Sequence, residues 1–178
     1  MRILKILITY YSGTGNTKKV AEAINEGITG HHVDLLPVND VDPSSLNSYD
    51  LVFIGSGLYG FNVSRKLTNL VKKAPQLPSK FAYYYTHENP QPNAYPDCFK
   101  SIDKIIENAN CEVLGQFDCT GENLVEKAEQ QRQALWNTYT PEKKKQAEEN
   151  WLNLVKEHPD AKDLENAKNF AISIINKL

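Results

Sequence analysis

The stretch Ser12-Gly13-Thr14-Gly15-Asn16-Thr17 constrains the fold of this chain more than any other part of the sequence. It follows an apolar run, residues 3–11, and precedes residues 18–28, whose apolar side chains recur at helical spacing. The order is therefore strand, tight turn and helix. Glycines let a ligand approach the backbone closely, and the free N–H groups and the dipole of a helix N-terminus favour an anion. The pattern predicts a phosphate site.

Two common phosphate loops do not fit this stretch. A nucleotide-binding P-loop requires Gly-x4-Gly-Lys-Ser/Thr, a spacing that neither Gly13 nor Gly15 provides. A dinucleotide fingerprint requires a third glycine where this chain has Lys18. One simpler alternative stays open, in which the stretch is only a glycine turn before a helix that Asn16 or Thr17 caps.

Length and composition indicate an ordinary globular protein. The chain of 178 residues suits one domain, and 40% of its residues are apolar while 24% are charged. A net charge of −2 gives no reason to expect nucleic acid or an anionic membrane as a partner. The three cysteines, Cys98, Cys111 and Cys119, form no Cys-x-x-Cys pair and are expected to be free thiols in a reducing cytoplasm.

Strand and helix patterns alternate along the chain. Apolar runs at residues 33–36, 49–55, 80–85 and 111–118 predict strands, and amphipathic spacing predicts helices at 63–74, 97–108, 142–157 and from Asp160 onwards. Such alternation predicts an α/β protein with a doubly wound, five-stranded parallel sheet in the order 2-1-3-4-5, covered by helices in a three-layer α/β/α arrangement.

The first loop resembles that of the flavodoxin family, which reads Ser/Thr-x-Thr-Gly-x-Thr and wraps the monophosphate of FMN. The matching residues are Ser12, Thr14, Gly15 and Thr17, with Asn16 in the variable position and Gly13 as the residue between. The resemblance implies that FMN is the cofactor and that these six residues hold its phosphate through neutral donors and the helix terminus.

A second loop supports the same resemblance. Residues 55–60 are similar to the family's Gly-x-Ser/Thr-x-aromatic-Gly turn, with Ser56, Gly57 and Leu58 before the aromatic residue. The resemblance implies that Tyr59 covers one face of the flavin ring and that Gly60 presents its backbone beside flavin N5. The alternative is a plain strand-to-helix turn with Tyr59 packed on the surface.

The third loop, residues 86–96, is long, polar and rich in proline. In the resembled family it binds the pyrimidine edge of the flavin, which here implicates Thr86, His87, Glu88 and Asn89, with Tyr95 as a second stacking aromatic. His87 is either an imidazole beside flavin N1 or a loop histidine bonded to the backbone, and we expect the latter. For Glu88 the two alternatives are a solvated side chain and a group that protonates a substrate, which would be the mark of an enzyme.

Residues 122–158 form a charged, helix-favouring segment before the last helix. We interpret the chain as one flavodoxin-like domain, residues 1–178, with a helical insertion at about 122–158. Thr140-Pro141 predicts a helix start there. Trp136 and Trp151 are expected to pack against the domain, the alternative being an exposed patch over the flavin.

These observations predict a cytoplasmic flavoprotein that carries single electrons between redox protein partners through non-covalently bound FMN. No catalytic side chain, metal, nucleic acid or membrane is expected to take part. The alternative function is an FMN-dependent NAD(P)H:quinone-type reductase, and a flavin-free binding module is a third possibility. Flavodoxins are usually strongly acidic, so the near-neutral chain departs from the family and weakens the case for docking to a basic partner.

Overall fold

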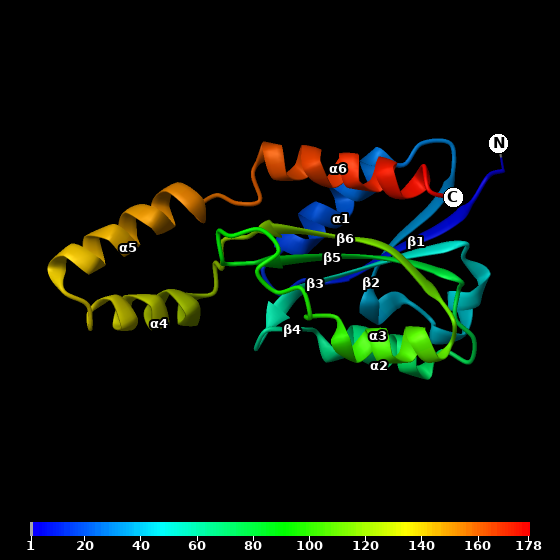
Figure 1. The fold of residues 1–178 in the computed structure, drawn as a ribbon, viewed down its shortest axis with the longest axis horizontal. Coiled ribbons are helices and arrows are strands. Elements are labelled where there is room, and N and C mark those ends of the chain that lie inside the picture. The colour runs from blue at the N-terminus through cyan, green and yellow to red at the C-terminus, as the bar shows by residue number, and fades with distance from the viewer. Residues whose placement is uncertain (1) are drawn as a thin grey trace.

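A parallel sheet in the order β2-β1-β3-β5-β6 forms the middle layer of the computed structural model, which describes residues 2–178 (Figure 1). Its strands are β1 (Lys5–Tyr11), β2 (His32–Pro37), β3 (Leu51–Tyr59), β5 (Lys80–His87) and β6 (Glu112–Thr120). The remaining strand, β4 (Asn62–Val63), pairs only with the end of β3. Without this short strand the order is 2-1-3-4-5, so the predicted fold class is confirmed.

Two helices cover each face of the sheet (Figure 1). Helices α1 (Asn16–Gly27) and α6 (Ala161–Ile175) lie on one face, and α2 (Arg65–Lys73) and α3 (Lys100–Asn108) lie on the other, together with short 3-10 helices at Val38–Asp40 and Pro43–Ser48. Successive tyrosines of β5 alternate between the two cores, because side chains of a strand alternate in direction: Tyr84 packs under α1, and Tyr83 and Tyr85 pack towards α3.

Strand β3 is longer than the sequence predicts. It continues from Gly55 to Tyr59, turns at Gly60 and Phe61, and returns as β4 in an antiparallel hairpin. Helix α2 therefore starts at Arg65, after the cap residue Ser64, and not at Val63. Residues 56–62, which were expected to form a loop, therefore form a hairpin that extends the strand.

Strand β5 is also longer than expected and includes Thr86 and His87, which the sequence analysis placed in a loop. Thr86 lies opposite Cys119, and His87 lies opposite Thr120, on β6. Both side chains are buried. Their positions are therefore set by sheet pairing and not by the conformation of the loop that follows.

Residues between β6 and α6 form a helical hairpin, α4 (Glu126–Trp136) and α5 (Pro141–Leu154), that projects away from the sheet (Figure 1). We call residues 122–158 the arm. The predicted start of α5 is confirmed, since Thr140 Oγ1 accepts a hydrogen bond from Lys143 N. No residue of α5 is fully buried, and the helix ends at Leu154, three residues earlier than predicted.

The two ends of the arm are joined where it leaves the domain. Glu122 N donates to His158 O over 2.8 Å, and Glu157 N donates to the Glu122 carboxylate over 2.9 Å. Next to this junction α6 begins where the sequence predicts, and Asp160 caps it: the Asp160 side chain accepts hydrogen bonds from Lys162 N and Asp163 N.

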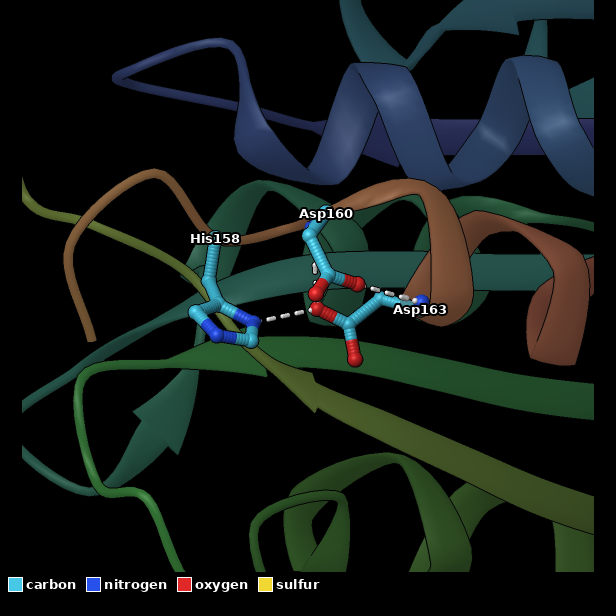
Figure 2. Close-up of side chains that lie close together, drawn as sticks. All are labelled: His158, Asp160 and Asp163. Carbon is cyan, nitrogen blue, oxygen red and sulfur yellow. Dashed lines mark hydrogen bonds and ion pairs between the residues drawn. The ribbon is translucent and has the colours of Figure 1, made fainter. Parts of the chain in front are cut away.

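Figure 2 shows how His158, Asp160 and Asp163 come together at that cap. The Asp163 carboxylate accepts from Asp160 N over 3.0 Å and lies 2.6 Å from His158 Nδ1. A helix capping box therefore accounts for the close approach of Asp160 and Asp163, and His158 joins them through its contact with the Asp163 carboxylate.

Burial raises the pKa of all three cysteine thiols, to about 12 for Cys98, so none favours the reactive thiolate form.

Within residues 2–178, no helix combines the length and the apolar character needed to cross a bilayer.

Candidate functional site

A cavity of about 610 Å³ opens where β3, β5 and β6 end and α1 begins. Ligands of open α/β sheets bind at this edge, and the volume suits a cofactor-sized molecule. Four segments provide its walls: the first loop, the β3–β4 hairpin, the end of β5 with Tyr95, and the base of the arm. The lining residues are Gly13, Thr14, Asn16, Gly57, Leu58, Tyr59, Gly60, Phe61, Thr86, His87, Glu88, Tyr95, Gly121, Asn123, Val125 and Gln131.

Most residues that the sequence analysis assigned to FMN are in these walls. The five that are not are Ser12, Gly15, Thr17, Ser56 and Asn89. Ser12 and Ser56 instead make hydrogen bonds within the segments that form the walls. Ser12 Oγ accepts a hydrogen bond from Gly15 N over 3.0 Å, and the buried Ser56 Oγ accepts one from Ser64 N over 2.9 Å. These two serines therefore hold the first loop and the β3–β4 hairpin in shape.

The N-terminus of α1 faces the cavity through the first loop. Gly15 is the residue before the helix, with a φ of 91° that favours glycine, and no side chain of Asn16 or Thr17 caps the helix. The capping alternative is therefore wrong. Asn16 Nδ2 instead donates to Glu122 O over 2.7 Å, which ties the first turn of α1 to the base of the arm.

A hydroxyl pair joins the first loop to the sheet. Thr17 Oγ1 and Thr86 Oγ1 lie 2.9 Å apart and are buried. Two hydroxyls that share one hydrogen bond use one proton for it, so the second proton is free to be donated. Thr86 lines the cavity, and the pair therefore adds a neutral donor beside the helix N-terminus.

Tyr59 lies across the first loop. Its hydroxyl is 3.0 Å from the point where a Cβ on Gly13 would stand, and its ring centre is 5.4 Å from that of Tyr11. Burial, and then the neighbouring Tyr11, raise the pKa of Tyr59, so its hydroxyl stays protonated at neutral pH. In this structure the side chain therefore covers the first loop, whereas the resemblance implies that it covers a flavin ring.

The turn of the hairpin has a left-handed backbone at two consecutive residues, Gly60 with a φ of 61° and Phe61 with a φ of 67°. The Phe61 side chain is 73% exposed, and its ring centre lies 5.8 Å from that of Tyr95. Two aromatic rings from separate segments therefore stand together at one wall of the cavity.

His87 pairs with a carboxylate. Its Nε2 lies 2.9 Å from Asp118 Oδ2, which also accepts from Asn93 N over 2.7 Å. The expected hydrogen bond to the backbone is therefore wrong. His87 Nδ1 is buried and has no partner among the described residues, although His87 is one of the residues that line the cavity. A buried polar atom without a partner is a place where a ligand can supply the missing hydrogen bond.

Glu88 is not simply solvated. It forms an ion pair with Arg132 of α4 and accepts a 3.4 Å hydrogen bond from Trp151 Nε1 of α5. Trp151 in turn packs edge to face on Trp136, with ring centres 6.4 Å apart. The two rings therefore pack on each other, and Trp151 also contacts the domain through Glu88.

Several lining residues were missed by the sequence analysis: Phe61, Gly121, Asn123, Val125 and Gln131. Phe61 directly follows the predicted turn, so its position next to Gly60 was a usable signal. The other four belong to or border the arm, and nothing in their local sequence shows that this segment returns to the carboxyl edge of the sheet.

Comparison with known proteins gives one family. The model described as "Flavodoxin domain" matches residues 7–172. An uncharacterized protein of Methanocaldococcus jannaschii is 26% identical over 173 residues, which cover 97% of this chain and 99% of the relative. The flavodoxin-like domain-containing protein BilS of Clostridioides difficile is 32% identical over 125 residues, 66% of each chain.

Solved structures show the same fold. A flavodoxin from the domain Archaea superposes with a TM-score of 0.61 at 19% identity, covering 98% of each chain. The flavodoxin of Streptococcus pneumonia TIGR4 superposes with a TM-score of 0.64 at 14% identity, covering 98% of this chain and 99% of the other. At such identities the likeness concerns the arrangement of the sheet and its helices.

Proposed function

Because the chain belongs to the flavodoxin family, whose members bind FMN and carry electrons, we propose that it binds FMN in the 610 Å³ cavity and passes single electrons between redox proteins. The observation that carries this proposal is the first loop, which presents a helix N-terminus and neutral hydroxyls at the wall of that cavity. The loop contains no carboxylate that would repel a phosphate.

The phosphate would be held by residues 12–17 together with the hydroxyl of Thr86. Donors there are the N–H groups of the first turn of α1, which have no carbonyl partner within the helix, and the unused proton of the Thr17–Thr86 pair. A phosphate in the loop would take the place of the Tyr59 hydroxyl, which now lies beside Gly13. Tyr59 would then be free to turn towards the flavin ring.

The ring would lie between the hairpin and the end of β5. Tyr59, Phe61 and Tyr95 provide aromatic surface there, and residues 57–60 and 86–88 provide backbone groups. Bound FMN supplies the electron chemistry, so the side chains of this site need only bind, orient and shield it. His87 Nδ1, buried and unpaired, would gain a hydrogen bond if a polar atom of the ring system reached it.

The partners would be a reductase and an electron acceptor, both proteins. A net charge of −2 gives weak long-range steering, so recognition would depend more on the exposed aromatic rim, above all Phe61, than on opposite charge.

Stepwise anaerobic reduction of the FMN-reconstituted protein, followed by its visible spectrum, tests the proposal. A long-wavelength band that grows and then decays during the titration is expected for transfer of one electron at a time. Direct bleaching to the two-electron form, together with unaided consumption of NAD(P)H in the presence of a quinone, would instead favour the reductase. Failure to retain FMN would contradict both functions.

A further inference from the structure

A second cavity, of about 580 Å³, lies between the arm and the segment that follows β5. Helices α4 and α5 supply most of its walls, including Trp136, Trp151 and Leu135, and Glu88 and Pro90 line it from the side of the domain. None of the sequence features discussed above predicts it. Its volume falls in the range of small-molecule sites.

The charged side chains of this cavity neutralise each other. Glu88 and Arg132 are the charged residues in its lining, and they form an ion pair. The Arg132 guanidinium also lies 4.4 Å from the ring centre of Trp151, where it gains from the electron-rich face of the indole. The cavity therefore offers no net charge to a ligand, and an ionic ligand would have to break this pair.

The walls are chemically suited to a flat, conjugated molecule. Two indoles set at 72° to each other, Trp136 buried and Trp151 partly buried, line the cavity with Ala147 and Val155 and give it planar, apolar walls. Amide side chains of Asn123, Gln131 and Asn150 stand around them as hydrogen-bond donors. We propose that this cavity binds an uncharged, planar, conjugated molecule with carbonyl oxygens, a class that includes quinones.

The second cavity adjoins the first. Glu88, Asn123 and Gln131 line both, so a molecule bound between the tryptophans would share a wall with the cofactor site. The identification of FMN as the ligand of the first cavity rests on the proposed function, whereas binding between the tryptophans does not depend on it. With FMN present, the second cavity would place a small conjugated molecule beside a carrier of electrons.

Tryptophan fluorescence reports on this cavity directly, because the chain contains two tryptophans and both line it. The probe is menadione, a neutral naphthoquinone, titrated into the FMN-loaded protein with correction for absorbed light. Quenching that saturates is expected. Linear quenching equal to that of free N-acetyltryptophanamide would overturn the proposal.

Two phenylalanine substitutions distinguish binding of menadione in the second cavity from quenching by random collision. Ala147→Phe fills the cavity and is expected to weaken menadione binding at least tenfold, whereas Ala134→Phe, on an exposed position of α4 outside the lining, leaves it unchanged. Equal affinity in the two variants would overturn the proposal. If Ala147→Phe does not fold, Asn150→Ala, which removes one exposed amide from the lining, should weaken binding about threefold to tenfold. Unchanged affinity for menadione in that variant would also overturn the proposal.

The two proposals fail in different ways. Saturable quenching in a protein that does not retain FMN would refute the proposed function and leave the second site standing. Retention of FMN with linear quenching would refute the second site alone.

Discussion

Thr14 separates recognition of a phosphate from recognition of a flavin ring. It lies in the first loop and lines the cavity, and its hydroxyl is a neutral donor to an anion. A hydrogen bond to a charged group contributes about 1.5–3 kcal/mol, so Thr14→Val should weaken FMN binding roughly 10- to 150-fold. Riboflavin lacks the phosphate and serves as the control ligand, since its affinity should not change. Equal losses for both ligands in fluorescence titrations would place the phosphate elsewhere.

A substitution at Gly60 can separate an effect of the backbone on protein stability from an effect on the bound flavin. Its φ of 61° is left-handed, and a Cβ there would meet no atom within 4 Å, so Gly60→Ala adds backbone strain and little else. A loss of about 1–2 kcal/mol is expected in urea unfolding. Gly30, with a φ of 77° and equally open surroundings, is the matched control.

Both variants, Gly60→Ala and Gly30→Ala, should lose similar stability, and only Gly60→Ala should change the course of the anaerobic reduction. Identical reduction curves for Gly60→Ala and the wild type would show that the backbone at this turn does not meet the flavin.

At the scale of the elements, the cap of α6 makes the stability of the fold depend on pH. Asp160 accepts from two backbone N–H groups, and replacing such a cap by alanine costs about 1 kcal/mol at neutral pH. The hydrogen bond from the Asp163 backbone is the largest cause that lowers the pKa of Asp160. The unfolded chain therefore binds the proton more tightly, so this stabilisation is complete above the unfolded pKa of about 3.9 and is lost as the pH falls through the folded value.

Urea unfolding of Asp160→Ala between pH 7 and pH 3 checks this expectation. The difference in free energy of unfolding from the wild type should be largest at neutral pH and should shrink below about pH 4. Asp160→Asn is the control, because asparagine keeps the cap without the titrating carboxyl. A difference for Asp160→Ala that is independent of pH would count against the charged cap.

The five main strands and helices α1, α2, α3, α5 and α6 followed from local patterns, whereas β4, α4, the ends of two strands and the placement of the arm did not. Apolar runs and the stripe of Ala167, Ala171 and Ile174 are set by periodicity, which a sequence displays. The extension of β3 to Tyr59 depends on pairing with β4, and the His87–Asp118 contact depends on the register between β5 and β6. Neither pairing is indicated by the sequence of the strands themselves.

The site was predicted where it depends on a short motif and missed where it depends on distant contacts. Residues 12–17 and 57–60 carry their own turn chemistry, so their clustering at the edge of the sheet could be inferred. Asn123 and Gln131 reach the cavity because Asn16 holds Glu122, 106 positions away, and because Glu88 holds Arg132. Such long-range pairs leave no periodic trace in a sequence.

For the whole molecule, the interpretation as one domain with a helical insertion makes a direct prediction. Neither core cluster contains a residue of 122–158, and the two ends of the arm are hydrogen-bonded to each other. Replacing residues 124–156 with a short Gly-Ser linker should therefore leave a cooperative urea transition, with less helix in the far-UV circular dichroism spectrum. FMN affinity should fall, because Val125 and Gln131 leave the cavity wall.

Removal of α6 is the matched control for this deletion. That helix buries Ala167, Ala171 and Ile174 against the sheet, so a chain that ends at residue 158 should not fold. If the chain without residues 124–156 unfolds as gradually as the chain without α6, the arm is an integral part of the domain and not an insertion.

Asn123 and Gln131 belong to the walls of two cavities at once. A molecule that fixes these side chains on one side changes the surface met by a molecule on the other, which is a coupling free energy between the two sites. Such coupling is reciprocal by thermodynamic necessity: whatever factor FMN applies to the affinity for a conjugated ligand, that ligand applies to the affinity for FMN. The arm would then make retention of the cofactor responsive to the concentration of a second small molecule.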